Sequence, residues 1–402
     1  MTSVIARSNA TKQSRLRLRS ATAGLLRGVY PERSRRARND DYNFFRIFAK
    51  KTDMNLISGI QQMGIGVANA PQGFELYKKA FGMNVRMFDD EGTAKLMLPY
   101  TNGEPQDRRA ILALNLRGGG GFEIWQYTKR TPKLPVFTPE LGDLGIAICK
   151  VKSDDIQGAY NHLKKHFTML CEPQKAPDSL MHFFCQGPAG NIFEVMEGLP
   201  FFGGGKSKTG GCAGAIIGVS DMEKSMKFYN EVLGYDMVIY DETAVFDDLS
   251  GILGGDKTFR RVLLSHSEPR VGPFSRLLGA SYIELLQAQN YEGRKLYKDR
   301  QWGDLGFIHL CFDVKKLDEM KARCESQGYP FTVDSAVAGQ KFDMGDAAGR
   351  FAYLEDPDGA LIELVETFKI PVLKKLNIYI DLEKRDPVKP LPDFMLKALK
   401  FA

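Results

Sequence analysis

The chain has 402 residues, of which 43% are hydrophobic and 26% are charged, a composition typical of globular proteins and long enough for two ordinary domains. No stretch approaches the roughly 18 consecutive apolar residues that a membrane helix needs, and no apolar segment with a small-residue cleavage site follows the N-terminus. We therefore predict a cytoplasmic protein with neither a membrane span nor a secretion signal.

The net charge of +6 originates in the N-terminal segment. Residues 1–53 carry ten Arg and three Lys against four acidic residues, so the rest of the chain is slightly acidic. Because nucleic-acid binding requires a basic surface, we predict no nucleic-acid partner for the folded part. The six cysteines contain no CxxC pair, which favours reduced thiols over a zinc ribbon or a disulfide framework.

The basic segment 1–53 is predicted to be disordered, because residues 8–37 mix Arg, Ser, Thr and Ala without apolar periodicity. Three interpretations stay open: a basic interaction tail, an organelle transit peptide, or translation from a point upstream of the natural start. Its sequence looks like a translated palindromic repeat of the kind found between bacterial genes. We favour this last interpretation, in which the segment is not part of the natural protein and Met54 is the start.

An internal repeat organises most of the remaining chain. The segments around FELYKKAFG and MKFYNEVLG repeat at an offset of 152 residues, whereas GDLG recurs at an offset of 161. The second copy should therefore contain an insertion of nine residues, which we expect between Asp247 and Ser275. The linker has the glycine content of a flexible connection. The predicted parts are the two halves 54–200 and 212–368, the Gly-rich linker 201–211 and the C-terminal extension 369–402.

Each half divides again into two modules of one plan, in which an apolar strand precedes an amphipathic helix and the last strand carries a glutamate. This pattern predicts an α+β protein of four modules. At the start of the third helix, Ser220 and Glu223 form a capping-box pattern. A carboxylate within an apolar strand is costly unless something compensates it, and strand alternation places it opposite its apolar neighbours. The four glutamates are Glu123, Glu194, Glu284 and Glu363.

Three motifs resemble the vicinal-oxygen-chelate superfamily, which includes glyoxalase I, bleomycin-resistance proteins and extradiol dioxygenases. They are FYNEVLGY at 228–235, LGFIHLCFDV at 305–314 and FAYLEDPDGALIEL at 351–364. The resemblance covers about residues 56–368 and is closest to four-module glyoxalase I-like proteins. It implies four βαβββ modules paired into two curved, mostly antiparallel sheet cups. In such proteins module one pairs with module four and module two with module three, although a pairing of neighbours stays open.

The resemblance also implies where metal ligands lie. The family's first-strand ligand lies five residues before the valine that ends the strand, and this position reads Gln62, Ile146, Gly214 and His309 in modules one to four. Gln62 and His309 alone can bind a metal there, and strand alternation places them on the glutamate-bearing face. The alternative for His309 is a hydrogen-bonded core histidine, and for Gln62 a hydrogen-bonded or solvated polar residue.

If modules one and four pair, the implied ligands resemble the set of one class of glyoxalase I. The second cup would then hold two glutamates opposite apolar positions, and we expect it to bind metal poorly or not at all. A pairing of neighbours would instead gather Glu284, His309 and Glu363. The predicted metal ligands are Gln62, Glu123, His309 and Glu363.

An imidazole with carboxylate and amide oxygens suits a divalent ion such as Zn, Ni, Co or Mn. By resemblance, such an ion polarises a carbonyl, stabilises an enediolate and acidifies the adjacent C–H, while a ligating glutamate moves the proton. We expect Glu363 first and Glu123 second in this catalytic role. The leading hypothesis is a metal-dependent lyase or isomerase of glyoxalase I type, monomeric or homodimeric, acting on a small carbonyl or hydroxy-acid derivative.

Two rivals remain. An extradiol dioxygenase requires two histidines and a carboxylate for its iron, and Gly214 occupies the place of the first histidine. A non-catalytic binding protein would hold a small molecule in an apolar, aromatic-lined cup without metal. Glutathione is doubtful as co-substrate, because the Arg that glyoxalase I carries just before its histidine falls here at residues 304–306. The C-terminal extension is expected to pack across a module or a partner subunit.

Overall fold

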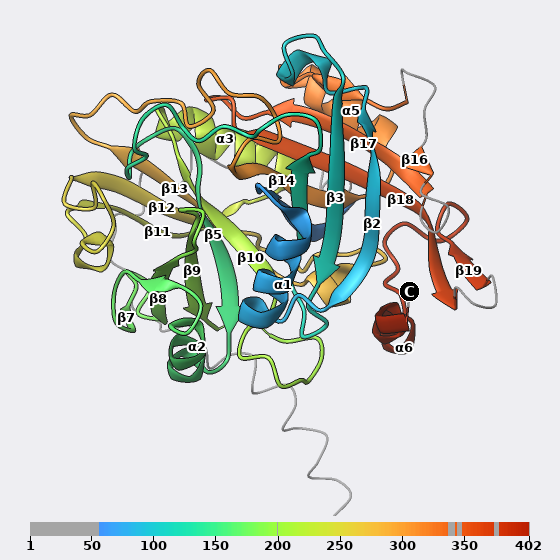
Figure 1. The fold of residues 1–402 in the computed structure, drawn as a ribbon, viewed down its shortest axis with the longest axis horizontal. Helices are drawn as coiled ribbons and strands as arrows, with labels where there is room; N and C mark the ends of the chain where they lie inside the picture. Colours follow the sequence, from blue (N-terminus) through green and yellow to red (C-terminus); the bar gives the residue numbers. More distant parts are fainter. Residues whose placement is uncertain (1–55, 199, 337–341, 344–347, 374–377, 402) are drawn as a thin grey trace, which may run out of the picture. The chain divides into compact units, whose positions relative to one another are not determined.

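The computed structural model describes five stretches of the chain: 56–198, 200–336, 342–343, 348–373 and 378–401. The predictions for residues 1–53 and for Met54 lie outside them. The described residues belong to one compact unit, Lys51–Ala402. They form an α+β fold of two mixed, mostly antiparallel sheets built from βαβββ-like modules, which confirms the predicted fold class (Figure 1). Among these residues, no helix is long and apolar enough to cross a membrane.

Modules one and four form the first sheet. Its strands are β1 (Ile57–Gly66), β2 (Val85–Ala94), β3 (Gln106–Leu114), β4 (Gly121–Tyr127), β14 (Gly306–Val314), β15 (Val333–Asp334), β16 (Phe342–Asp343), β17 (Ala348–Glu355), β18 (Leu361–Leu373) and β19 (Ile378–Asp381). They lie in the order β15-β17-β18-β14-β1-β4-β3-β2, with β16 beside β17 and β19 beside β18. The central pair β1 and β14 is antiparallel and joins the two modules.

Modules two and three form the second sheet in the same way. Its strands are β5 (Gly145–Ser153), β6 (Thr168–Met169), β7 (Gln174–Lys175), β8 (Met181–Gln186), β9 (Ile192–Glu197), β10 (Cys212–Gly218), β11 (Met237–Ala244), β12 (Phe259–Ser265) and β13 (Tyr282–Ala288). Their order is β11-β12-β13-β10-β5-β9-β8-β6, with β7 beside β8. The pairing of one with four and two with three is confirmed, and the pairing of neighbours is wrong.

Six α-helices accompany the strands in the described part of the chain. They are α1 (Ala70–Phe81), α2 (Ile156–Leu163), α3 (Met222–Leu233), α4 (Ser275–Leu278), α5 (Leu317–Ser326) and α6 (Asp393–Ala398), with 3-10 turns at Leu98–Tyr100, Asp247–Leu249 and Leu399–Phe401. Helices α1 and α3 end at Gly82 and Gly234, both with a left-handed backbone that favours glycine. These are the glycines that the repeat aligns.

The predicted capping box of Ser220 and Glu223 is wrong by one residue. Asp221 is the N-cap of α3, and its carboxylate accepts a hydrogen bond from the backbone N–H of Lys224. Ser220 instead donates from its backbone N–H and its hydroxyl to Asp358, at 2.9 and 2.5 Å. Ser220 is thus bound to Asp358 of module four, and Asp221 caps the helix in its place.

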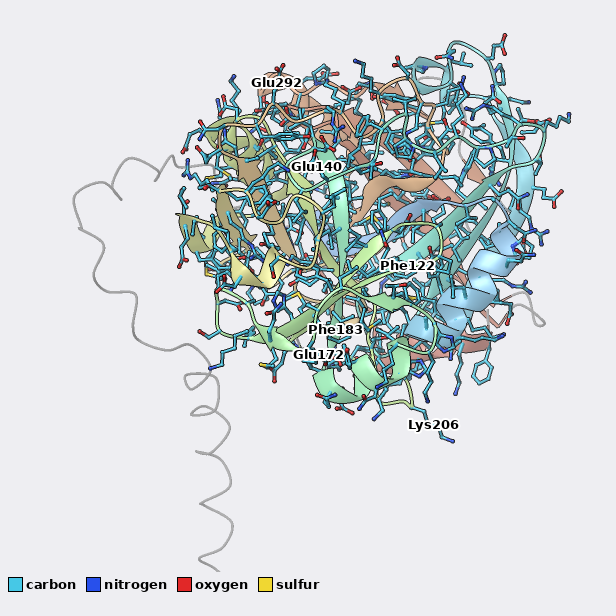
Figure 2. The ribbon with its side chains drawn as sticks, turned by 60° about the vertical axis from the view of Figure 1, so that its left-hand side comes forward. Phe122, Glu140, Glu172, Phe183, Lys206 and Glu292 are labelled. Carbon is cyan, nitrogen blue, oxygen red and sulfur yellow. The ribbon has the colours of Figure 1, made fainter. Side chains whose placement is uncertain are left out.

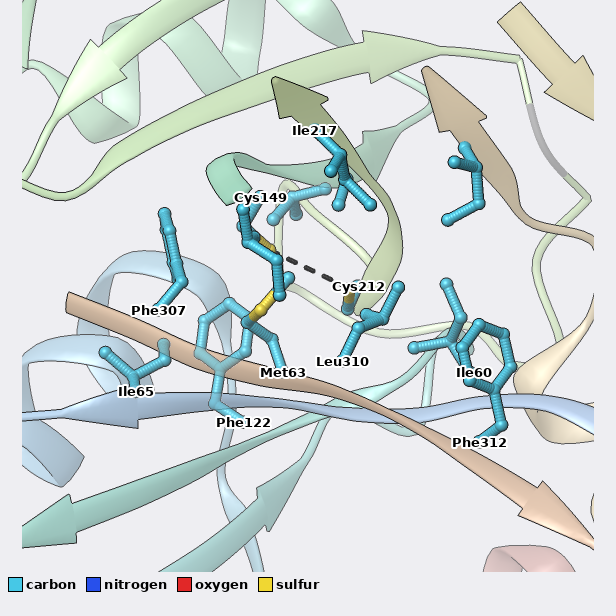
Figure 3. Close-up of a cluster of buried hydrophobic side chains, with 14 of the residues drawn as sticks. Ile60, Met63, Ile65, Phe122, Cys149, Cys212, Ile217, Phe307, Leu310 and Phe312 are labelled. Carbon is cyan, nitrogen blue, oxygen red and sulfur yellow. Dashed lines mark hydrogen bonds between the residues drawn. The ribbon is translucent and has the colours of Figure 1, made fainter. Parts of the chain in front are cut away.

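The main core lies between the apolar faces of the two sheets. Met63 and Leu310 of the first sheet face Cys149 and Ile217 of the second (Figure 3). Figure 2 shows Phe122 within the body, whereas exposed side chains cover the outside. All six cysteines are free thiols, as predicted, and five are buried. Because the apolar faces are used between the sheets, the glutamate-bearing faces are the ones left to form cups.

The extra residues of module three lie between β12 and β13, at 266–281, where module one has the shorter loop 115–120. The insertion thus starts and ends later than the predicted 247–275. It contains α4, whose Leu277 packs with Leu399 of the C-terminal extension against Val85 and Leu114 of the first sheet. The extension therefore packs across module one, one of its two predicted positions.

The linker 201–211 is hydrogen-bonded along the loop 115–120. The backbone N–H of Gly211 donates to Gly118 O at 2.7 Å, and that of Cys212 donates to Gly120 O at 2.7 Å. A Cβ at Gly211 would lie 2.2 Å from Gly120 O. Glycine here permits close packing between two chain segments.

Candidate metal centre

Strand register brings the predicted ligands of modules one and four together. Gly64 at the centre of β1 lies opposite His309 of β14 on one side and opposite Glu123 of β4 on the other. Gln62 lies opposite Cys311, the next residue on that face of β14. Cys311 in turn lies opposite Glu363 of β18. Four neighbouring strands thus each contribute one of the four predicted side chains.

The side chains of these residues meet on one face of the sheet. His309 Nε2 lies 3.3 Å from Glu123 Oε2 and 3.0 Å from Glu363 Oε2. Each of these three residues offers a ligand atom within 4.8 Å of the others. The amide of Gln62 donates to Glu363 Oε2 at 3.4 Å. The structure therefore brings all four predicted residues to one place, and the ligand atoms of Glu123, His309 and Glu363 lie within the spacing that a single cation requires.

The imidazole of His309 is held by its surroundings. A Cβ at Gly64 would lie 2.4 to 2.7 Å from three ring atoms of His309, so a larger residue there would collide with the ring. Trp302 stacks on the imidazole with centroids 6.4 Å apart, and Tyr353 contacts it edge-on at 5.5 Å. These contacts fix the ring plane without hydrogen bonds, which leaves its nitrogens available.

The electrostatics and the donor set fit a divalent cation. Burial lowers the pKa of His309, but the charges of Glu363 and Glu123 outweigh it and raise that pKa to about 9. Without a cation the imidazole therefore carries the proton that offsets the two carboxylates. In the described part of the chain, Gln62 Oε1 and His309 Nδ1 are buried without a hydrogen-bond partner. Buried orphan atoms are costly, and a cation would engage the amide oxygen and replace the proton.

A cavity of about 550 Å³ opens onto three of the four residues, and His309 is buried behind Trp302 and Tyr353, which also line it. Glu123, Glu363 and Gln62 form its polar floor, and Trp125 and Tyr353 stand beside them. Such a volume lies within the range of small-molecule sites, roughly 300 to 1,000 Å³. The candidate ligands thus lie at the bottom of a cavity that a substrate can enter.

Residues 212–364 match the family model described as Glyoxalase/Bleomycin resistance protein/Dioxygenase superfamily. Residues 212–364 therefore belong to this superfamily. The match covers modules three and four, and modules one and two repeat their plan. A comparison with curated proteins found no match.

Several solved structures of superfamily enzymes are similar to this chain. Glyoxalase I from Zea mays has 13% identity, covers 77% of this chain and 92% of its own, and has a TM-score of 0.46. A putative dioxygenase from Bacillus subtilis has 13% identity, covers 78% and 86%, and has a TM-score of 0.49. The Mn(II)-bound glyoxalase from Novosphingobium aromaticivorans has 12% identity, covers 84% and 88%, and has a TM-score of 0.26. At these values the matches carry no argument about the reaction.

The alternation of residues along β1 did not predict that Gln61 also lines the cavity. The ladder between β1 and β14 shifts between Ile60 and Gln62, which makes Gln61 the extra residue of a β-bulge. Both Gln61 and Gln62 consequently line the cavity, whereas Ile60 and Met63 lie in the core. A bulge re-aims a side chain in this way and leaves no mark in a pattern of alternating residues.

The second cup is filled by a lysine. The ammonium of Lys150 forms ion pairs with Glu194 and Glu284, the two glutamates predicted to face this cup, and all three side chains are buried. Burial lowers the pKa of Lys150, but the two carboxylates raise it above its ordinary value, so the ammonium stays charged. The remaining cavity measures about 10 Å³. A cation tethered to β5 thus takes the place between the glutamates.

The ligand position that we read for module two is wrong by two residues. Ile148, not Ile146, occupies the place of His309, because Ile148 pairs with Ile216 as His309 pairs with Gly64. The GDLG repeat gives this alignment, whereas the valine used as reference does not. Lys150, two residues further, shares the face of Ile148, and the two lysines of β5 were the signal that sequence reading overlooked.

More charges surround that lysine. Arg261 pairs with Glu284 and, at 2.6 Å, with Asp248, while His182 Nδ1 lies 2.8 Å from Glu194 Oε1. The network is closed and buried, so it holds the second sheet together rather than facing a ligand. The place where glyoxalase I carries its Arg holds Asp304, which accepts two hydrogen bonds from Arg130 at 2.8 and 3.0 Å. Asp304 is fully buried and anchors the loop before β14.

Proposed function

We propose that this superfamily member is a metal-dependent lyase or isomerase of glyoxalase I type, which moves a proton within a carbonyl or hydroxy-acid derivative. The observation that carries the proposal is the convergence of an amide, an imidazole and two carboxylates from four adjacent strands at the floor of one cavity. Gln62, Glu123, His309 and Glu363 would hold the cation.

A bound divalent cation such as Zn, Ni, Co or Mn would polarise a substrate carbonyl and acidify the C–H beside it. The chain's own contribution is the position of each side chain and the exclusion of water. Trp302 and Tyr353 hold His309 in place, and the amide of Gln62 orients the Glu363 carboxylate. The buried floor keeps water from the carbon whose proton moves.

Glu363 is our first choice for the group that moves the proton, and Glu123 is the second. Burial is the largest influence on Glu363 and raises its pKa, although the neighbouring His309 brings the pKa below its ordinary value. Once the carboxylate leaves the positive charge, burial makes it a stronger base. The side chain of Glu123 is 15% exposed and lies nearer the open cavity.

Elemental analysis of the purified protein tests this proposal. Wild type should contain close to one divalent metal ion per chain, and Glu363→Gln and His309→Ala should lose most of it, because each removes a ligand from a small set. Glu242→Gln, on the exposed edge strand β11, is the matched control and should keep the metal. Full retention in both site variants, with normal folding, would show that the site is misplaced.

A non-catalytic binding protein is the second candidate, favoured by the aromatic and apolar walls of the cavity. The same measurement separates the two, because a binding protein of that kind needs no metal. For a dioxygenase, Gly214 of β10 lies opposite Lys150 in the filled second cup, which offers no open ligand position there.

A further inference from the structure

The walls of the metal-site cavity are apolar well beyond the reach of the metal ligands. Near the floor they consist of Trp125, Trp302 and Tyr353. Further away the lining is aliphatic and aromatic side chains from several elements, among them Met87, Leu114, Leu277, Ile370 and Leu399.

This cavity is larger than a three-carbon carbonyl compound needs. Its volume of about 550 Å³ is one that drug-sized ligands fill, with polar groups at one end and apolar surface along the rest. The small substrate predicted from sequence would leave most of this apolar surface exposed to water. A ligand with a large apolar body would cover it.

The charges on the lining do not select a polyanion. Four carboxylates, of Asp89, Asp90, Glu123 and Glu363, line the cavity with two basic side chains, Lys95 and Arg108. Arg108 is already paired with Asp90 at 2.6 Å, and Lys95 is exposed. A divalent cation would bring the lining close to neutrality. A conjugate with several carboxylates or phosphates would therefore find little to hold it.

The apolar end is built by segments outside the repeated modules. Leu277 and Leu278 come from the insertion of module three, and Leu399 comes from the C-terminal extension. Both segments pack across the ends of β2 and β3 and complete the wall there. In the described part of the chain, the second cup is lined by the loop at 176–180 instead, and its remaining cavity measures about 10 Å³. The added segments are thus specific to the open cup.

We infer that the cavity binds a molecule whose oxygen-bearing head meets the metal centre and whose uncharged, apolar body lies against the insertion and the C-terminal extension. This inference rests on the proposed function for the head and on the cavity alone for the body.

Intrinsic fluorescence tests it directly, because both tryptophans of the chain line the cavity. The probes are 1,2-butanediol, 1,2-hexanediol and 1,2-octanediol, titrated into zinc-loaded protein and into protein stripped with a chelator. Burying one CH₂ contributes roughly 0.8 kcal/mol, so each added methylene should tighten binding about fourfold, on the order of 200-fold from butanediol to octanediol.

Two variants locate the apolar body. Met87→Asn, at a half-buried position of β2, and Leu399→Asn should reduce the gain per methylene from about fourfold to about twofold or less, because the alkyl chain then meets a polar amide. Phe394→Gln, an exposed position in the same C-terminal extension, is the control and should leave the gain unchanged. Thermal unfolding checks that each variant is folded.

The outcomes separate this inference from the proposed function. A steep dependence on chain length in both zinc-loaded and stripped protein, reduced in the two variants, supports the inference. A flat dependence in wild type overturns it and leaves the metal proposal standing. A steep dependence in a protein that binds no zinc supports the apolar cavity and overturns the metal-dependent function.

Discussion

A single added methyl group at Gly64 should disable the metal site. In Gly64→Ala the new Cβ would lie 2.4 Å from His309 Cε1, whereas ordinary van der Waals contacts begin at 3.4 Å. The ring must therefore move by about 1 Å, and metal sites tolerate deviations of only about 0.2 Å in ligand distance. Misorienting a ligand typically costs 10- to 100-fold in metal affinity, and we expect a loss at least that large.

Competition with a chromophoric chelator would measure the zinc affinity of Gly64→Ala. Gly204→Ala is the control, because a Cβ there has no neighbour within 4 Å. The double variant Gly64→Ala with His309→Ala should recover thermal stability, since the collision disappears, but not zinc binding. Wild-type affinity in Gly64→Ala would refute the placement of the imidazole beside β1.

Three other changes test separate parts of the structure. Burial, together with the charge of Arg117, lowers the pKa of Lys152 from 10.5 to about 8. Between these two pH values the unfolded chain binds a proton that the folded chain does not. The buried charge therefore lowers the stability of the fold by its full amount below about pH 8. Lys152→Met should raise the stability at pH 7 by at most about 3 kcal/mol, and this difference from wild type should shrink as the pH rises towards 10.5. A difference in denaturant titrations that does not depend on pH would contradict this. Lys150→Met removes the cation that Glu194 and Glu284 share, although Glu284 keeps Arg261, and should cost about 3 to 5 kcal/mol of stability. Adding Glu194→Gln should recover part of this loss, and a neutral effect in the same titrations would mean that the lysine does not balance the two carboxylates. Gln62→Ala should lower metal content while Gln61→Ala keeps it and weakens only diol binding; identical behaviour of the two variants would count against the bulge.

The internal repeat is the reason that the candidate site could be predicted. The family resemblance marked positions on the first and last strands of a module, which are His309 and Glu363 in module four, and the repeat gave Gln62 and Glu123 as the same positions in module one. Family resemblance supplied the pairing of these modules. Strand alternation was sufficient for Glu123 and Glu363, because β4 and β18 are regular where they carry these residues. The ladder between β1 and β14 shifts directly beside His309, so alternation alone did not place that ligand.

The parts that sequence could not predict lack either regularity or a repeated counterpart. The bulge at Gln61 changes which side chains share a face, and bulges depend on local strand twist rather than on residue pattern. The walls supplied by Leu277 and Leu399 come from the insertion of module three and the C-terminal extension, which the repeat does not align with another described segment. Lys150 was visible as a charge in an apolar strand, but only the correct alignment with β14 shows that it points between two glutamates.

Because Lys150 fills one cup, the two sheets differ in the source of the positive charge that lies between their glutamates. The second sheet supplies its own positive charge through the side chain of Lys150 and needs no added ion. Under the proposed function, the other sheet takes its positive charge from a bound divalent ion. When metal is scarce, the protein should therefore stay folded but lack its metal-dependent activity. The sheet that contains Lys150 needs no ion and should keep the strands of the other sheet in place until a metal ion binds.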